Sequence, residues 1–400
     1  MIETLIVVIT LSSGFLVVYH HALYPLILRY VRKTKSPETI IAEARSYAKR
    51  TGDTELPSIT IVIPAYNEQQ WISEKIRNLA ALDYPPERLK VIIACDGCED
   101  DTPELAERVA QEAECRHLNL NIRSFTQNRG KIAVINDVVQ SVDTDLVALS
   151  DVSALISIDA LLIAAAHFKD ERVGVLNSHY QLLSPGSAGE STYWRYQSDI
   201  KASEAALGAT LGAHGAFYLF RRKLFQPLAG DTINDDFILP MEIVAKGYRA
   251  KHADDMNALE LEQAGQDQDH YRRRRIAAGN CQQLLRLKHL MLPRHGGVAF
   301  TFFSGKGLRV LMPFLMLIAL IGSLILAVNS PLFAVLALLQ VTLYALAAWQ
   351  ITFQQDQPPG NTNLGLSGQW TSRGHDWYVA IPVWSRKRPL ATRHDLTWHS

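Results

Sequence analysis

Two long stretches of the sequence contain no Asp, Glu, Lys or Arg, and they restrict the possible folds more than any other feature. The first runs from Thr4 to Leu28, and the second, of 46 residues, runs from Val310 to Gln355. A helix that crosses a bilayer needs about 20 apolar residues. The first stretch therefore predicts one membrane-spanning helix. The second is interrupted by Asn-Ser-Pro at 329–331 and predicts a hairpin of two.

Basic residues flank the apolar stretches and predict how the chain lies in the membrane. They follow the first stretch at 29–35, precede the second at 306–309 and recur at 386–388. By the positive-inside rule, the middle of the chain and its C-terminus would be cytoplasmic, which makes this a multi-pass protein of the inner (plasma) membrane. A cleaved signal peptide is the alternative for the first stretch, but it would carry basic residues ahead of its apolar core, where only Glu3 is charged.

Charge composition gives no argument for a polyanionic partner. The chain has 40 basic and 40 acidic side chains among 400 residues, so we expect no nucleic-acid partner. The apolar stretches divide the chain into six expected segments. They are an anchor at 1–35, a juxtamembrane linker at 36–57, a cytoplasmic domain at 58–283, an amphipathic interfacial segment at 284–307, a transmembrane hairpin at 308–355 and a cytoplasmic tail at 356–400.

Patterns of strands and helices alternate through the first part of the cytoplasmic domain. This alternation predicts an α/β fold with a mostly parallel sheet and helices on both of its faces. The expected strands are 59–63, 89–94, 121–125 and 146–149, followed later by 173–176 and 216–220, and the expected helices are 72–82, one from 102, 131–141 and 192–207.

Two of the expected strands end in an aspartate, Asp96 and Asp151. Ligands bind at the carboxyl edge of an open α/β sheet, and an unpaired charge there is costly unless a ligand or cation meets it. Helix capping is the structural alternative for each aspartate taken singly. Ser153 follows Asp151 by two residues, and a carboxylate with such a hydroxyl can hold a hard cation that in turn holds a diphosphate.

Two charged clusters follow in the second half of the domain. Asp235 and Asp236 open an expected helix, where carboxylates also stabilise the helix dipole without any further role. Four consecutive arginines occupy 272–275. Such a run is typical of a basic face near an anionic membrane. The alternative, favoured by its position, is that Arg272 or Arg275 binds a diphosphate through its guanidinium group.

These motifs, in this order and spacing, resemble the family 2 glycosyltransferases, which are inverting enzymes with a GT-A fold. The resemblance rests on Pro-Ala-Tyr-Asn-Glu at 64–68, Asp-Gly-x-x-Asp-x-Thr at 96–102, Gly130-Lys131 with Asn136, and Ser150-Asp151. It implies that Mg²⁺ or Mn²⁺ binds at Asp151 and Ser153, although the family motif is often Asp-x-Asp and this sequence has serine second. The implied nucleotide-sugar contacts are Pro64, Tyr66, Glu68, Asp96, Lys131, Asp151, Arg272 and Arg275.

The resemblance extends to the acceptor side. Asp236, with Leu239 and then Gly247-Tyr248 downstream, is similar to the family's Thr-Glu-Asp block, which implies that Asp236 is the general base and Asp235 its neighbouring acid. Processive relatives carry Gln-x-x-Arg-Trp, and the Gln and Trp are missing here in register, so processivity is left open.

The function implied is transfer of a sugar from a nucleotide sugar, of the UDP type, to a polysaccharide or polyprenyl-phosphate acceptor at the bilayer. Three spans are few for a secretion channel, so a lipid-linked acceptor, a homo-oligomer or export partners are expected. The alternative is an inactive membrane partner of a polysaccharide-synthesis complex, which the serine at 153 and the missing Gln and Trp would support.

Overall fold

The computed structural model divides the chain into two compact units. The helical unit comprises 1–28 together with 302–355, and the sheet unit comprises the described part of 29–301. The described residues are 1–35, 40, 42, 45–183, 188–262 and 269–355. The expected tail at 356–400 therefore lies outside them.

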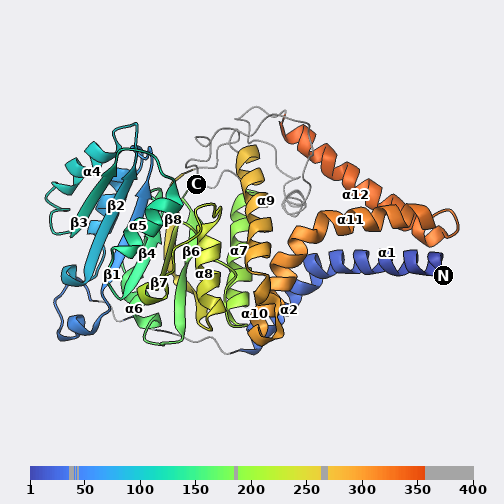
Figure 1. The fold of residues 1–400 in the computed structure, drawn as a ribbon, viewed down its shortest axis with the longest axis horizontal. Coiled ribbons are helices and arrows are strands. Elements are labelled where there is room, and N and C mark those ends of the chain that lie inside the picture. Colours follow the sequence, from blue (N-terminus) through green and yellow to red (C-terminus); the bar gives the residue numbers. More distant parts are fainter. Residues whose placement is uncertain (36–39, 41, 43–44, 184–187, 263–268, 356–400) are drawn as a thin grey trace. The chain divides into compact units, whose positions relative to one another are not determined.

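The sheet unit is built on one mixed sheet of eight strands in the order β3-β2-β1-β4-β7-β6-β8-β5 (Figure 1). The first four strands in this order are parallel, as predicted, and β7 joins the sheet antiparallel to β4. The strands are β1 Ile59–Ala65, β2 Leu89–Asp96, β3 Leu120–Phe125, β4 Leu146–Ser150, β5 Ala154–Ile156, β6 Val173–Leu182, β7 Phe217–Arg221 and β8 Arg249–Glu260.

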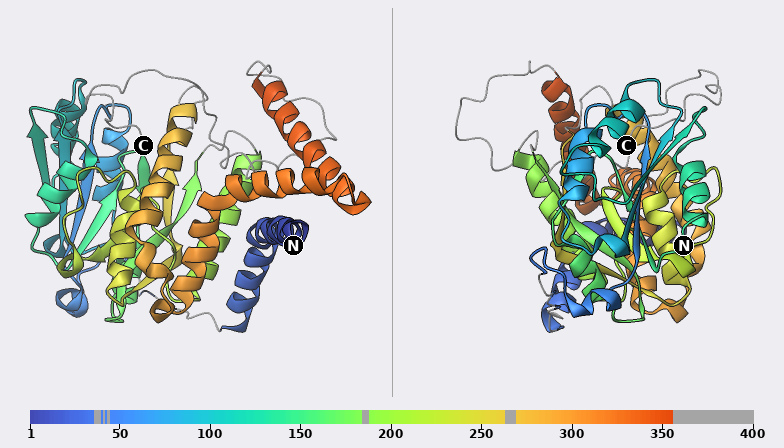
Figure 2. Two further views of the ribbon diagram at one scale, coloured as in Figure 1. Left: turned by 45° about the vertical axis from the view of Figure 1, so that its right-hand side comes forward. Right: turned by 90° about the vertical axis from the view of Figure 1, so that its left-hand side faces the viewer.

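Helices lie on both faces of this sheet, as Figure 1 and Figure 2 show. The short loops between β1, β2, β3 and β4 place each helix beside the strands that it connects. The helices of the sheet unit are α3 Ile72–Ala80, α4 Thr102–Ala110, α5 Lys131–Gln140, α6 Ala160–His167, α7 Ala188–Ala205, α8 Asp235–Ala245, α9 Asp269–Arg286 and α10 Gly297–Thr301. The expected boundary between 283 and 284 falls inside α9.

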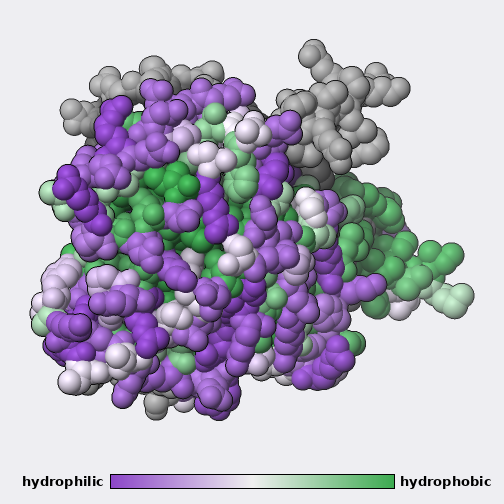
Figure 3. All heavy atoms as spheres, turned by 60° about the vertical axis from the view of Figure 1, so that its left-hand side comes forward, coloured by the Kyte–Doolittle hydropathy of each residue, from purple (hydrophilic) through white to green (hydrophobic). Residues whose placement is uncertain are grey.

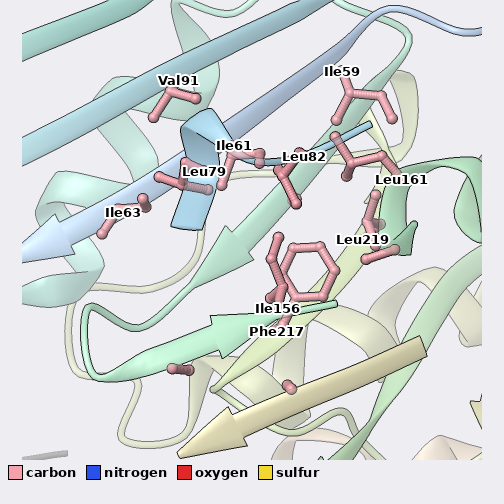
Figure 4. Packing of buried hydrophobic residues seen from close by; sticks show 14 of the residues in the cluster. Ile59, Ile61, Ile63, Leu79, Leu82, Val91, Ile156, Leu161, Phe217 and Leu219 are labelled. Carbon is pink, nitrogen blue, oxygen red and sulfur yellow. The ribbon is translucent and has the colours of Figure 1, made fainter. Parts of the chain in front are cut away.

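The core of the sheet unit forms around β1, which is buried along its whole length. Alternate residues of a strand point to opposite faces, and Ile61 and Ile63 point to the face covered by Leu79 of α3 (Figure 4). Fully burying an aliphatic side chain of this size contributes about 1.5–3 kcal/mol. A strand covered on both faces reads as a continuous apolar run, which is why the sequence predicts it well.

The strands β5 and β8 and the helices α6 and α9 of the sheet unit were not predicted. β5 has three residues, and β8 pairs parallel to β6 and antiparallel to β5. β8 carries charged side chains over most of its length, so it has no apolar run. The helix α9 contains the four arginines and has no strong apolar stripe in its sequence.

Part of the expected linker at 36–57 contacts the sheet unit through an ion-pair network. Arg45 is buried, and its guanidinium group donates hydrogen bonds to Asp53 at 2.9 and 2.7 Å and to Asp83 at 3.0 Å. The Arg45 guanidinium holds the pKa of Asp53 down at about 2, aided by the Arg50 backbone. This ion pair network fixes the residues that immediately precede β1.

The helical unit contains α1 Ile2–Val18, the first part of α2 Tyr24–Thr34, α11 Leu308–Leu326 and α12 Pro331–Gln355. Gly322 of α11 packs so closely on Thr10 of α1 that a Cβ would collide with the threonine side chain. Small residues allow such close approach between helices in membranes. The hydroxyl of Tyr19 also bonds that of Ser304 at 2.8 Å.

Apolar side chains gather on the outside of the helical unit, whereas the surface of the sheet unit is largely hydrophilic (Figure 3). Phe314 and Leu317 of α11 are each more than half exposed. Two continuous helices, 2–34 and 297–326, are long and apolar enough to cross a bilayer, and a shorter apolar helix covers 331–346. Length and composition alone are weak evidence, because a signal sequence or a core helix also meets them.

Candidate active site

Asp151 follows the last residue of β4, at the sheet edge where the parallel strands end. Its backbone N–H donates to the carbonyl of Ala216 at 3.3 Å, and its Oδ1 accepts a hydrogen bond from Nζ of Lys131 at 2.7 Å. Lys131 is the first residue of α5, directly after Gly130, whose φ of 86° is in the left-handed region that glycine favours. The structure thus brings together two residues that are twenty positions apart.

Asp96 shapes the turn that presents this lysine. Its carboxylate is fully buried and accepts the backbone N–H groups of Arg129 at 2.9 Å and Gly130 at 2.8 Å. Asp96 and Lys131 therefore belong to one local arrangement at neighbouring strand ends. Contact between Asp96 and a nucleoside stays a prediction.

The loop after β1 carries the next group of predicted residues. Pro64 is buried within β1, and Tyr66 and Glu68 lie half-buried in the loop. The backbone N–H of Glu68 donates to Oγ1 of Thr102 at 2.7 Å, which joins this loop to the one after β2. Burial raises the pKa of Glu68 to about 8, helped by the nearby carboxylates Glu262 and Asp151.

Asp235 and Asp236 begin α8, as predicted. From this second half of the domain, Asp236 lies near Asp151 at the sheet edge. The carbonyl of Asp236 accepts the N–H of Ala213 at 2.7 Å. A Cβ on Gly215 would lie 3.1 Å from Oδ2 of Asp151 and 3.9 Å from Oδ2 of Asp236. The two carboxylates therefore both lie beside the Gly215 backbone.

The charges at this point are coupled. Burial raises the pKa of Asp236 to about 6, and the adjacent Asp235 carboxylate adds to the effect. Burial opposes the positive charge of Lys131, but Asp151, followed by Asp235 and Asp236, outweighs it and raises the pKa of that lysine. Lys131 is thus a firmly charged ammonium group between the two halves of the site.

Ser153 lies beside a carboxylate that the sequence did not single out. Ser153 is only 3% exposed, and its hydroxyl hydrogen-bonds to Glu260, the last residue of β8. Burial raises the pKa of Glu260, with Asp151 contributing as a like charge. Since β8 was not predicted, its final residue was not recognised as another strand end at this edge. The role of Ser153 as a metal ligand stays a prediction.

A second missed residue is Lys75 of α3, which is fully buried beneath the end of β4. Its Nζ donates to Oγ of Ser150 at 2.6 Å and to the carbonyl of Ala154. Burial lowers the pKa of Lys75 to about 7, against the opposing effect of Asp151 and Glu260. A single lysine in an amphipathic helix pattern normally lies on the solvent side, so the sequence gives no signal for this position.

A third missed residue is Lys201 of α7. Its Nζ donates to the carbonyls of Leu211, Gly212 and Ala213 at 3.3–3.4 Å, and so holds the loop that leads to Gly215. Burial lowers the pKa of Lys201, while Glu204 and Asp236 oppose this shift. The loop also carries His214, whose ring stacks on Tyr180 with centroids 3.7 Å apart.

The arginines at 272–275 lie in α9, and the side chain of Arg272 is outside the described part of the structure. Arg275 is partly buried one helical turn before Gly279, where a Cβ would collide with the amide of Asn234. Residues four apart share one face of a helix. Arg275 therefore shares the face of α9 on which Gly279 contacts Asn234, the residue before α8.

The family model described as "Glycosyltransferase like family 2" matches residues 57–278. This segment is more than half of the chain and contains every candidate residue from Pro64 to Arg275. It leaves out the apolar helices of the helical unit.

Two curated relatives match over a similar length. The chain is 27% identical over 206 residues to the poly-beta-1,6-N-acetyl-D-glucosamine synthase of Staphylococcus aureus (strain COL), covering 50% of this chain and 48% of that protein. It is also 27% identical over 216 residues to the beta-monoglucosyldiacylglycerol synthase of Trichormus variabilis, covering 51% of this chain and 44% of that protein. The matches thus span about half the length of these relatives.

Among solved structures, the chain is similar to the mannosyltransferase PcManGT from Pyrobaculum calidifontis, determined in complex with GDP-Man and Mn²⁺. The TM-score is 0.64 at 23% sequence identity, over 87% of this chain and 92% of that one. This similarity confirms the expected GT-A type of fold. Since the family model spans the sheet, both strand-end aspartates and the start of α8, the chain belongs to glycosyltransferase-like family 2.

Proposed function

We propose that this chain is a membrane-anchored inverting glycosyltransferase, which transfers a sugar from a UDP-sugar to a polysaccharide or polyprenyl-phosphate acceptor at the cytoplasmic side of the bilayer. One observation carries the proposal. Asp151, from the nucleotide-sugar half of the sheet, and Asp236, from the other half, both point to the backbone of Gly215. A donor diphosphate held at Asp151 and an acceptor hydroxyl held at Asp236 would therefore meet beside the Gly215 backbone.

The carboxylates around Asp151 fit a hard divalent cation, Mg²⁺ or Mn²⁺. The available donors are oxygens. Besides burial, the charges of Glu262 and Asp151 raise the pKa of Glu68 and that of Glu260. Such repulsion is relieved when a cation binds. We propose Asp151 as the principal ligand, with the hydroxyl of Ser153 and the carboxylate of Glu260 beside it. When bound, the cation neutralises negative charge on the diphosphate leaving group.

Asp236 would act as the general base. It removes the proton from the acceptor hydroxyl while that oxygen attacks the anomeric carbon of the donor sugar. The bond between that carbon and the diphosphate oxygen breaks in the same displacement, which inverts the configuration. A base with a pKa of about 6 is mostly ionised at neutral pH and still has appreciable proton affinity.

Positive groups would bind the departing diphosphate. Lys131 is charged and already directed at Asp151, and Arg275 lies on the face of α9 nearest the start of α8. Guanidinium and ammonium groups placed where charge develops stabilise the transition state. Pro64, Tyr66, Glu68 and Asp96 would contact the nucleoside, and Arg272 would be a further diphosphate contact.

The names of the relatives support the choice of acceptors to test. One is a synthase of poly-beta-1,6-N-acetyl-D-glucosamine and another a synthase of beta-monoglucosyldiacylglycerol. A glycan and a lipid therefore both belong in the assay. The apolar exterior of the helical unit would keep the enzyme at the bilayer where either acceptor is found.

The test is release of nucleoside diphosphate from a panel of UDP-, GDP- and dTDP-sugars, using membranes that contain the intact protein. We expect release from one UDP-sugar, dependent on a divalent cation and on an added glycan or polyprenyl phosphate. Asp236→Asn should lower the rate by about 10²–10⁴, which is the usual contribution of a general base. The anomeric configuration of the product, read by NMR, tests inversion.

Asp231→Asn is the matched control, because Asp231 lies in the same segment but its side chain is 76% exposed and bound to Arg286. It should keep nearly full activity. Release from a GDP-sugar would correct the donor. An Asp236→Asn protein as active as the control would rule out Asp236 as the base, and folded protein without turnover of any donor would contradict the proposed reaction.

A further inference from the structure

A cluster of potential metal ligands lies on β6 and β8, away from the groups assigned to the transferase reaction. It consists of His179 on β6 with His252 and Asp254 on β8, and one ligand atom from each lies within 4.8 Å of the others. The strands are parallel neighbours, and an irregularity between Ser178 and His179 shifts their register at this point. Ser178 pairs with Ala253 and His179 with Asn257, so Asp254 is one of the extra residues of β8 at this irregularity.

The imidazole of His252 is buried and that of His179 is half-buried, and each has a buried nitrogen without the hydrogen bond that such a nitrogen usually makes. The His252 side chain is 1% exposed. Its Nδ1 and the Nδ1 of His179 have no hydrogen-bond partner among the residues that the structure describes. A buried polar nitrogen left unpaired costs about 1–3 kcal/mol. Two such nitrogens next to one carboxylate point to a ligand that accepts their lone pairs.

The donor atoms of the cluster suit a metal ion. Imidazole nitrogens and carboxylate oxygens are among the ligands that Zn²⁺ takes from proteins, and a neutral imidazole offers a lone pair to the metal. Nε2 of His252 lies 3.3 Å from Oδ1 of Asp254.

We propose that His179, His252 and Asp254 form a binding site for one divalent transition-metal ion, with Zn²⁺ as the best match. Two imidazoles and one carboxylate are a donor set that Zn²⁺ favours, with an open fourth position. Tetrahedral Zn²⁺ with bonds of about 2.0–2.1 Å would bring the ligand atoms to roughly 3.3 Å from one another. Asp254 is 61% exposed at its side chain and can move to close the site.

A partner of the carboxylate is already in place. Oδ2 of Asp254 lies 3.4 Å from the guanidinium of Arg32, which is also 3.4 Å from Oδ1 of Asp199. A ligating carboxylate that is held by a second group is oriented by it and binds its metal more tightly. Oδ1 remains directed at His252, so the metal does not need to displace the arginine.

A metal bound at this site would stabilise the protein and would support the loop that leads to Gly215. Asn177 is the register partner of His252 on β6. Its side chain accepts the N–H of His214 at 2.9 Å and donates to the carbonyl of Gly212 at 3.3 Å. A metal that joins β6 to β8 would therefore support the strands from which the Gly215 loop is held. The proposal does not depend on the transferase mechanism.

Metal binding to the detergent-solubilised full-length protein tests the proposal directly. The protein is stripped with chelator, desalted and dialysed against Zn²⁺ or Co²⁺ without nucleotide. We expect one metal per chain, a rise in the unfolding temperature with Zn²⁺, and visible d–d absorption with Co²⁺ typical of four-coordinate nitrogen and oxygen ligands. The same stoichiometry in Asp151→Asn would show that the metal is not at the donor site.

Variants at the cluster complete the test. His252→Asn should abolish stoichiometric binding, and Asp254→Asn, at an exposed side chain where the fold is tolerant, should weaken it at least tenfold. His117→Asn, at an exposed histidine outside the cluster, should change nothing. Wild-type protein that retains no metal after desalting, or binding that is undiminished in Asp254→Asn, would overturn the proposal.

Discussion

The protonation of Asp236 depends on its immediate surroundings. Burial and the Asp235 carboxylate raise its pKa to about 6, while Lys131 and Lys201 act in the opposite direction. The base is inactive when protonated, so activity should fall as the pH drops through this value. Below the transition, the expected loss is about tenfold for each pH unit.

Asp235→Asn provides the residue-scale test of this coupling. Removing the negative charge beside Asp236 favours the ionised form, so the acid limb of the profile of kcat/KM should move to lower pH. Burial still acts, and the limb should therefore stay above the ordinary range for an aspartate. The profile of Asp231→Asn is the control and should match that of the wild type. An acid limb that does not move in Asp235→Asn would show that the two carboxylates are not coupled.

Several site residues could be predicted from the sequence because their chemistry coincides with an element boundary. Asp96 and Asp151 end apolar strands, and Asp236 opens a helix. At each of these positions the strand or helix pattern and the acidic residue type both indicate a functional site. Lys75, Glu260 and Lys201 could not be found in this way. Their importance follows from the tertiary structure. It buries Lys75 of α3 beneath the sheet, and it places the end of β8, a strand that was not predicted, at the same sheet edge as Asp151.

The helix α9 holds the start of α8 in position. Gly279 packs against Asn234, Gln282 accepts the backbone N–H of Ile233 at 2.9 Å, and Arg286 bonds Thr232 at 2.7 Å. These residues are three or four apart and form one row with Arg275 along the helix. The row reaches every residue from 232 to 234, just before the two aspartates.

Gly279→Ala should disturb this contact without weakening the helix. The added Cβ would collide with the Asn234 amide, whose Cγ would be 2.9 Å away, while alanine favours a helix interior over glycine by about 1 kcal/mol. We expect nearly unchanged thermal stability and a fall in kcat of up to about 10²-fold, as is typical for a displacement of about 1 Å at a reacting group. Gly230→Ala, where a Cβ meets nothing within 4 Å, should keep the wild-type kcat. Equal activities would refute a positioning role for α9.

The elements themselves were predictable to different degrees. The strands β1, β2, β3 and β4 are apolar and separated by clear turn signals, so their parallel pairing could be predicted from the sequence, whereas their order in the sheet comes from the structure. β8 has twelve residues, but several of its positions are exposed and carry charged side chains. Its sequence therefore lacks the apolar pattern on which strand prediction depends.

At the scale of the whole molecule, the sequence predicts an apolar part and a hydrophilic part, and these correspond to the helical unit and the sheet unit. The helical unit exposes large apolar side chains such as Phe314, whereas a sheet domain in water would bury them. The apolar stretches could be predicted to form long apolar helices because about 20 consecutive residues without charge are typical of a membrane-spanning helix. The structure adds the close packing of α1 on α11 at Gly322, for which no apolar pattern gives a signal.

The proposed topology can be tested with a cysteine that the chain already has. Cys281 is exposed on α9, whereas Cys95 and Cys115 are buried and Cys98 is half-buried. If the sheet unit faces the cytoplasm, a membrane-impermeant maleimide should label Cys281 only after cells are permeabilised. Asn329→Cys in a Cys281→Ser background is the opposite probe, because residue 329 is exposed between α11 and α12 and should be labelled in intact cells. Labelling of Cys281 in intact cells would place the sheet unit outside, where no cytoplasmic nucleotide sugar could reach it, and would overturn the topology.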